Sequence, residues 1–145
     1  MSLGIVTPQI LQDVGVKIVW RVQGSKRVHM SREYDSAKSM ISHMEKPRTV
    51  ITLLPESMQE SEKMLKSIVE DMGPLDVILD CVVDSTNKVK HRSMYCREHS
   101  TQYMSIDFVN DGIFVAGTRI AYLENKNLLR KINNRIYYTG SIEEV

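Results

Sequence analysis

The amino-acid sequence predicts a single α/β domain with a mixed sheet, built on a central βαβ unit and completed by antiparallel strands near the C-terminus. Three observations lead to this prediction. Residues 49–54 (TVITLL) are apolar and β-branched, residues 56–72 repeat apolar side chains at helical spacing, and residues 77–83 (VILDCVV) are again nearly all apolar. A strand, a crossover helix and a second strand in this order predict a parallel pair.

Local signals set the boundaries of the βαβ unit. Pro55 ends the first strand, and Gly73-Pro74 ends the helix. Within the helix, Leu65, Ile68 and Met72 fall on one face and are expected to pack on the two strands. Near-continuous apolar strands are typical of a sheet that is covered on both faces.

The segments before this unit are less regular. Turn and capping residues divide them into four expected elements. These are a short helix over 7–11, a strand over 16–22, a second strand over 26–30, and a helix that begins at Ser31 or Asp35 and ends at Met44.

The segments after the unit are predicted to be a polar loop followed by strands. Residues 85–101 form the loop, and residues 103–109 alternate as a strand that turns at Asn110-Asp111-Gly112. Further strands are expected over 113–123 and 128–138, with a turn over 124–127. Alternation places Met104, Ile106 and Phe108 in the core.

Composition favours a soluble intracellular protein of the cytoplasm or nucleus, with one domain over residues 1–145. The chain is 42% hydrophobic and 26% charged, which is ordinary for a globular domain. We expect no membrane span, because no apolar run approaches about 18 residues. Two cysteines, Cys81 and Cys96, are too few for a disulfide framework and suit a reducing compartment.

Charge is distributed unevenly along the chain although the net charge is only +1. Residues 17–48 carry a net charge of +5, residues 56–84 carry −6, and residues 86–145 carry +3. Two interpretations remain open. The segments form a dipolar surface that steers an anionic partner, or their charges interleave in space and cancel.

The polar loop over 85–101 is the first place to expect a binding site. Its cations and one aromatic side chain are suited to phosphates and a stacked base, and these candidate nucleic-acid contacts are Lys88, Lys90, Arg92, Tyr95 and Arg97. Zinc is a weaker alternative, because the four residues of suitable type lack the usual close spacing: Cys81, His91, Cys96 and His99. We therefore expect no metal and no catalytic residue.

Three carboxylates share one face of the strand over 77–83. Asp76, Asp80 and Asp84 follow one another at intervals of four residues, and carboxylates at strand ends can hold Mg²⁺. The alternative is that Asp76 is solvated at the sheet edge and Asp84 caps a turn. Asp80 alone then needs a partner inside the protein.

Residues 49–85 resemble the strand–helix–strand portion of short-chain dehydrogenases, in which a Gly-x-hydrophobic-Asp turn leads into a central strand. The resemblance implies a nucleotide-binding fold. Tyr34 and Lys38 also match that family's Tyr-x-x-x-Lys pattern, which implies a Tyr general acid, but here the pattern precedes the βαβ unit. No GxGxxG or GxxxGxG loop precedes it, so the resemblance implies a degenerate relative without a cofactor.

By elimination, the sequence favours a non-enzymatic protein-interaction or assembly module without cofactor. Nine methionines suit an adaptable binding surface, and the last predicted strand has the mixed charge of an edge strand. The expected contact with a protein partner or a second copy is Ile136, Tyr137 and Tyr138. The alternatives are a small nucleic-acid-binding domain, with Lys26, Arg27 and Arg32 beside the polar loop, and the degenerate dehydrogenase-like enzyme domain.

Overall fold

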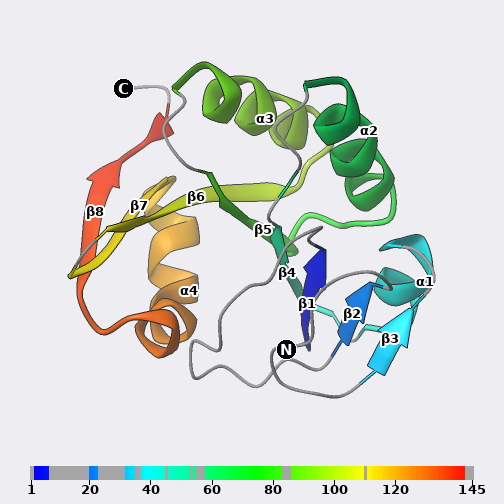
Figure 1. Cartoon of the computed structure of the whole chain (residues 1–145), viewed down its shortest axis with the longest axis horizontal. Helices are drawn as coiled ribbons and strands as arrows, with labels where there is room; N and C mark the ends of the chain where they lie inside the picture. The colour runs from blue at the N-terminus through cyan, green and yellow to red at the C-terminus, as the bar shows by residue number, and fades with distance from the viewer. Residues whose placement is uncertain are drawn as a thin grey trace.

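The computed structural model describes residues 2–6, 20–22, 32–34, 37–44, 46–52, 54, 58–82, 86–109 and 111–142. Eight strands and four helices occur in these residues (Figure 1). In chain order they are β1 (Ser2–Val6), β2 (Trp20–Val22), β3 (Arg32–Tyr34), α1 (Ala37–Ser42), β4 (Arg48–Thr52), α2 (Met58–Val69), β5 (Val77–Cys81), α3 (Thr86–Glu98), β6 (Gln102–Val109), β7 (Gly112–Gly117), α4 (Arg119–Ile132) and β8 (Ile136–Gly140).

The strands form one mixed sheet in the order β3-β2-β1-β4-β5-β6-β7-β8. Neighbouring strands run parallel except for the antiparallel pair β6 and β7. The predicted α/β class, with a central βαβ unit and an antiparallel pair near the C-terminus, is confirmed.

The central βαβ unit lies where the sequence predicts it. Thr49 of β4 pairs in parallel with Val77 of β5, and α2 forms the crossover between them. Leu65, Ile68 and Met72 are buried, as their helical spacing predicts. The helix itself is shorter than the predicted 56–72, since it ends at Val69 and a turn leads to Gly73.

Helices cover both faces of the sheet, so the described residues form two apolar cores (Figure 1). The core under α1, α2 and α3 takes alternate strand residues such as Val50 and Ile78. The core under α4 takes their neighbours, including Ile51 and Leu79. All five residues of β4 and of β5 are buried, which explains why both strands read as continuous apolar runs.

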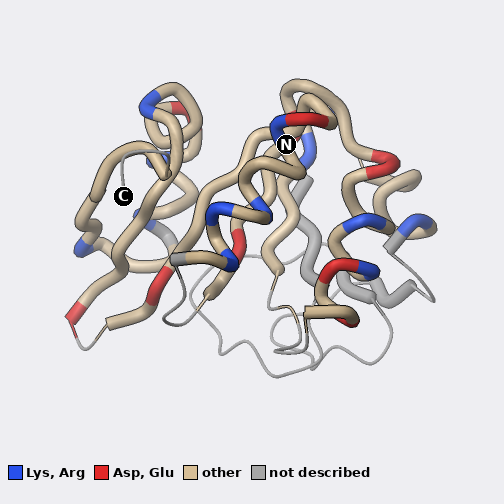
Figure 2. The backbone as a smooth tube through the Cα atoms, turned by 90° about the horizontal axis from the view of Figure 1, so that it is seen from above, with Lys and Arg blue, Asp and Glu red and all other residues tan. Residues whose placement is uncertain are grey.

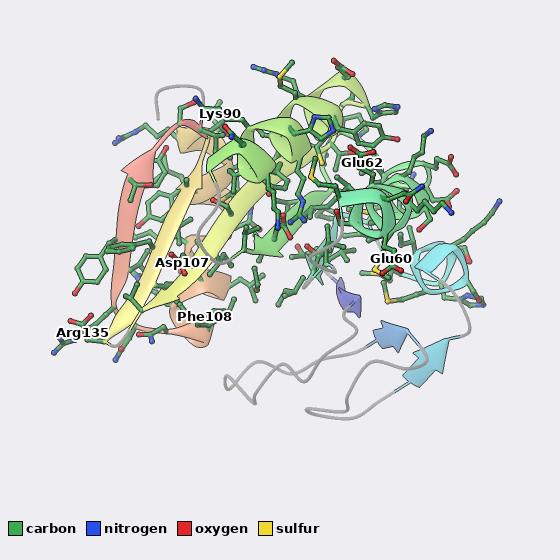
Figure 3. The ribbon with its side chains drawn as sticks, turned by 45° about the horizontal axis from the view of Figure 1, so that its top comes forward. Glu60, Glu62, Lys90, Asp107, Phe108 and Arg135 are labelled. Atoms are coloured by element: carbon green, nitrogen blue, oxygen red, sulfur yellow. The ribbon has the colours of Figure 1, made fainter. Side chains whose placement is uncertain are left out.

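The predicted hairpin over 103–109 and 113–123 is confirmed as the antiparallel pair β6 and β7, although its second strand ends at Gly117 and one predicted core residue is exposed. Met104 and Ile106 are fully buried beside α4. Phe108 is 44% exposed, because it lies toward the hairpin end of β6 (Figure 3). Tyr103 on the opposite face is buried as well, since the face toward α3 is also covered.

The predicted loop over 85–101 is wrong, because residues 86–98 form α3. Apolar side chains do not recur at helical spacing along this segment, so its periodicity resembles that of a loop. The side chains that α3 buries are Arg92 and Cys96, which lie one helical turn apart. A polar side chain therefore attaches this helix to the sheet, and a hydrophobic pattern does not reveal it.

The predicted strands over 113–123 and 128–138 are also wrong in part. β7 ends at Gly117, and Thr118 caps α4 by accepting a hydrogen bond at Oγ1 from the amide of Ala121 (3.2 Å). The predicted turn over 124–127 lies inside this helix. Helical spacing buries Ala121, Leu128, Leu129 and Ile132 against the sheet, and a strand resumes only at β8.

The predictions for the N-terminal segments are confirmed only in part. The helix over 7–11 and the strand over 26–30 lie outside the described residues, and only 20–22 of the strand over 16–22 are described, as β2. The predicted helix that ends at Met44 corresponds to α1. β1 and β3 were not predicted, because β3 has only three residues and β1 (SLGIV) shows no alternating pattern.

Positions of Lys and Arg and positions of Asp and Glu are interspersed along the described backbone (Figure 2). The separation by sequence segment therefore does not produce a single pole of either sign in that part of the chain. Among the helices that are described, none is both long and apolar enough to cross a bilayer.

Packing of α2 on the sheet gives a direct test of the fold. The Ile68 side chain is fully buried among apolar groups, so Ile68→Asp would bury an unpaired carboxylate. We expect this change to lower the free energy of unfolding by more than about 3 kcal/mol in urea denaturation. Lys66→Asp, on the exposed face of the same helix, should change it far less; equal effects would contradict the packing.

Candidate functional site

The strand order locates the edge of the sheet at which a ligand is expected. From β1, the chain proceeds to β2 and β3 on one side of the sheet and then to β4, β5 and β6 on the other. Open parallel sheets of this kind bind ligands outside the carboxyl ends of the strands at this reversal. The edge is therefore formed by Val6, Thr52 and Cys81, the last residues of β1, β4 and β5.

A buried polar cluster lies behind this edge, centred on Asp80 of β5. The Asp80 side chain is fully buried and accepts three hydrogen bonds. Thr52 Oγ1 donates to Oδ1 (2.7 Å), Arg92 Nη1 donates to Oδ2 (2.8 Å), and the Tyr103 hydroxyl also donates to Oδ2 (2.5 Å). One carboxylate thus connects four elements, β4, β5, β6 and α3.

Burial keeps the phenol of Tyr103 and the thiols of Cys81 and Cys96 protonated around this cluster. Desolvation by burial, reinforced by the charge of Asp80, raises the pKa of Tyr103 well above its usual value. The same two causes raise the pKa of Cys81 and of Cys96 to about 12. The phenol and both thiols are therefore neutral at physiological pH, and neither thiol is an activated nucleophile.

A second buried ion pair lies at the opposite, amino-terminal ends of β4 and β5. Arg48 Nη2 lies 2.8 Å from Asp76 Oδ2, and Asp76 also accepts from the backbone amides of Arg48 (2.6 Å) and Gly73 (2.7 Å). Asp76 is 2% exposed, so its predicted solvation at the edge is wrong. Asp80 does need a partner, as predicted.

No metal site is found among the residues that the structure describes. The four candidate zinc ligands do not converge: Cys81 belongs to the core under α4, and Cys96 belongs to the core on the opposite face. His91 Nε2 instead lies 2.9 Å from Glu62 Oε1 on α2. Asp76 and Asp80 each pair with an arginine, and Asp84 lies outside the described residues.

The candidate nucleic-acid contacts lie on α3, and they do not act as a group. Arg92 is buried against Asp80 and is not available to a phosphate. The ring of Tyr95 packs on His99 with centroids 4.3 Å apart. Lys90 and Arg97 are exposed, and Figure 3 shows Lys90 on the α3 surface. Lys88 is half-buried.

The candidate partner contact lies on β8, an edge strand of the described sheet. Tyr137 is 40% exposed and meets Phe114 edge to face. The Tyr138 ring stacks on Tyr122 with centroids 4.4 Å apart, and Ile136 packs against the core. Association through Ile136, Tyr137 and Tyr138 stays a prediction.

The Tyr-x-x-x-Lys pattern does not lie near the polar cluster in the sheet. Tyr34 ends β3, which is the other edge strand, and Lys38 follows in α1. The order of strands places β2 and β1 between β3 and β4. The catalytic pair that the resemblance implies is therefore not assembled at the Thr52–Asp80 cluster.

No protein-family model and no curated protein sequence matches the chain. Solved structures do match. An imine reductase from Myxococcus stipitatus in complex with NADP+ has a TM-score of 0.73 at 8% identity, covering 98% of this chain and 56% of the other. Mycobacterium tuberculosis 3-hydroxyisobutyrate dehydrogenase with L-serine has a TM-score of 0.71 at 12% identity, covering 97% and 55%. Plasmodium falciparum 6-phosphogluconate dehydrogenase has a TM-score of 0.73 at 17% identity, covering 97% and 37%.

These similarities and the strand order identify a Rossmann-like fold. The chain spans about half the length of the first structures it matches. The predicted non-enzymatic interaction module is wrong, because the chain shares its fold with imine reductases and dehydrogenases, among them an imine reductase and a 6-phosphogluconate dehydrogenase that were solved with NADP+. The nucleic-acid alternative gains no support from the comparisons either. Its basic loop is a helix whose central cation is buried.

The Asp80 cluster can be tested through its charge balance. Asp80→Asn would leave the buried Arg92 cation without its counter-charge. We expect a loss of about 3–5 kcal/mol in the free energy of unfolding, measured in urea. Replacing both partners, as Asp80→Asn with Arg92→Met, should recover part of the loss. A single variant as stable as the parent would contradict the pairing, and Glu98→Gln on exposed α3 surface is the matched control.

A second test uses the raised pKa of Tyr103. Above pH 10.0, the unfolded chain loses the phenolic proton while the folded protein retains it, so folding stability falls as pH rises. The slope of stability against pH reaches about 1.4 kcal/mol per pH unit above pH 10.0 and is absent below it, where the full stability is retained. Tyr103→Phe should therefore flatten the dependence of stability on pH above 10, measured by urea midpoints. Cys81 and Cys96 contribute equally to both proteins, so parallel curves would contradict the raised pKa.

Proposed function

We propose that this chain is the dinucleotide-binding domain of an NAD(P)-dependent oxidoreductase. The observation that supports this best is the strand order, with its reversal between β1 and β4, in a fold shared with an imine reductase that was solved with NADP+. The nucleotide would lie across the carboxyl ends of β1 and β4. An intracellular location follows from the proposal, because nicotinamide nucleotides are held inside cells.

The phosphate-binding sequence is the feature of the chain that fits this proposal least. The glycine fingerprint uses three glycines after β1 so that the backbone can approach the pyrophosphate closely. Residues 7–19 of this chain contain a single glycine, Gly15. The fingerprint is therefore absent, and we expect nucleotide affinity well below that of a domain that carries it.

The sequence after β2 favours NADP, which carries a 2′-phosphate on its ribose, over NAD. In this fold an acidic residue about 20 residues after the fingerprint binds the NAD ribose, whereas a nearby Arg accommodates the 2′-phosphate of NADP. β2 ends at Val22, and the next charged residues are Lys26 and Arg27. The first acidic residue after β2 is Glu33, inside β3. NADP(H) should therefore bind more tightly than NAD(H).

Nucleotide binding is the activity that we assign to this chain. The matched structures are 3-hydroxyisobutyrate, 6-phosphogluconate and imine enzymes, and the chain spans only part of each. Within the described residues, the polar cluster behind the edge is satisfied internally by Thr52, Arg92 and Tyr103. Its role in the proposal is to hold the ends of β4 and β5 in register.

The test is a calorimetric titration of the purified chain with NADPH and with NADH. We expect NADPH to bind more tightly than NADH at the same salt concentration. Lys26→Ala with Arg27→Ala should remove that preference by weakening NADPH about tenfold or more while leaving NADH nearly unchanged. Two lysines on exposed α2 surface provide the matched control, as Lys63→Ala with Lys66→Ala.

Two results would overturn the proposal. The first is that neither nucleotide binds at millimolar concentration to a chain that is folded by circular dichroism. The second is that the Lys63, Lys66 control weakens NADPH as much as the Lys26, Arg27 pair does, which would show nonspecific attraction of a polyanion to surface charge.

A further inference from the structure

The edge strand β8 has backbone groups that point away from the described sheet. It pairs in parallel with β7 on one side, and Figure 1 shows it as the outermost described strand at that end of the sheet. The carbonyl of Arg135 accepts a hydrogen bond from the amide of Ile113 on β7 (2.9 Å). Because the backbone groups of successive residues alternate between the two sides of a strand, Ile136 and Tyr138 direct their N–H and C=O groups outward.

The sequence of β8 lacks the features that usually keep edge strands from pairing. It reads IYYTG, with no charged residue and no proline. By contrast, two of the three residues of β3 (REY), at the other edge of the described sheet, are charged. The irregularity in the pairing of β7 with β8 comes after Val115 and Tyr138, so residues 136–138 form a regular strand. A regular and uncharged edge of this kind is a template for a further strand.

Tyr137 lies at the centre of this edge, on the sheet face opposite the core under α4. Its side chain is 40% exposed. The ring meets Phe114 edge to face, and the hydroxyl donates to Asp111 Oδ2 (3.2 Å). Both contacts hold the ring in place within one chain, so association would order it at a lower cost in entropy.

A second copy of β8 fits this edge when the two strands run antiparallel about a twofold axis at Tyr137. Ile136 then lies opposite Tyr138 of the second copy, and the outward N–H and C=O groups of both residues are paired. Tyr137 lies opposite its own equivalent in a pair without hydrogen bonds, and aromatic cross-strand pairs of this kind are stabilising. Arg135 lies opposite Thr139, about 13 Å along the strand from its own equivalent. The net charge of +1 adds little repulsion between two copies.

We propose that β8 pairs with β8 of a second copy of this chain, so that two eight-stranded sheets join through Ile136, Tyr137 and Tyr138. The strand order separates β8 from β4 by β5, β6 and β7, so this pairing leaves the proposed nucleotide edge free. Association therefore does not depend on nucleotide binding. Two short strands bury less area than a standard interface, so we expect a weak dimer that is half-formed at about 0.1 mM chain.

The first experiment is sedimentation equilibrium of the purified chain at concentrations up to about 1 mM, in which we expect a monomer–dimer equilibrium. Tyr137→Lys places like charges opposite each other and should weaken the dimer about tenfold or more. Phe114→Lys is the matched control, because Phe114 is similarly exposed on the same face but lies one strand away from the edge. An equimolar mixture of the Tyr137→Lys and Tyr137→Glu variants should restore association, since opposite charges then meet at the axis.

Cysteine cross-linking tests the register of the two strands. Under oxidation, Tyr137→Cys should form a disulfide-linked dimer, because the Cα atoms of a pair without hydrogen bonds lie about 4.5 Å apart, within the reach of a disulfide. Thr139→Cys is also exposed on β8 but should not cross-link, because its equivalent lies about 13 Å away along the strand. Cys81 and Cys96 are buried and should not compete.

Any of three results would exclude this pairing. One is a chain that is folded by circular dichroism and stays monomeric at about 1 mM. Another is equal weakening by Tyr137→Lys and Phe114→Lys, which would indicate contact between sheet faces and not between edges. The third is cross-linking of Thr139→Cys as fast as that of Tyr137→Cys, which would indicate a different register.

Discussion

The hydrogen-bonded carboxylate of Asp80 is the interaction on which the centre of this molecule depends. Burying an ionised carboxylate is unfavourable unless a counter-charge and donors replace its water. Arg92, Thr52 and Tyr103 supply both, and each comes from a different element. Because the three donors must converge on one group, the ends of β4 and β5 and the height of α3 above the sheet are fixed together. The edge at which we place the nucleotide is built on this constraint.

The sequence predicts those parts of the fold in which burial repeats regularly. β4, α2 and β5 follow from the apolar run over 49–54, the helical spacing of Leu65 and Ile68, and the second apolar run. The β6–β7 hairpin follows from Asn110-Asp111-Gly112 between alternating segments. In each case a few neighbouring residues carry the whole signal, so the pattern and the structure agree.

Elements that depend on distant partners were predicted incorrectly. α3 is attached through Arg92, whose counter-charge lies 12 residues away on β5, and the same arginine was predicted to contact phosphate. The apolar residues of α4 resemble those of a strand. The signal for a helix is the N-cap Thr118, whose role depends on where β7 ends. The prediction of an interaction module is wrong for a related reason. The missing glycine fingerprint implies a relative without a cofactor, whereas the Rossmann-like fold is defined by strand order, which a single sequence does not display.

The contrast between α2 and α3 has a consequence for folding order. α2 presents Leu65, Ile68 and Val69 to the sheet and can dock through nonspecific apolar contact as soon as β4 and β5 associate. α3 also packs Val89, Tyr95 and Cys96 on the core, but its buried Arg92 needs the Asp80 carboxylate, so its docking is complete only once that group and the Tyr103 hydroxyl are in place. Docked α3 should therefore be the later of the two to form. Its backbone amides should exchange with deuterium sooner than those of α2. Local unfolding near the carboxyl ends of β4 and β5 should therefore begin at α3.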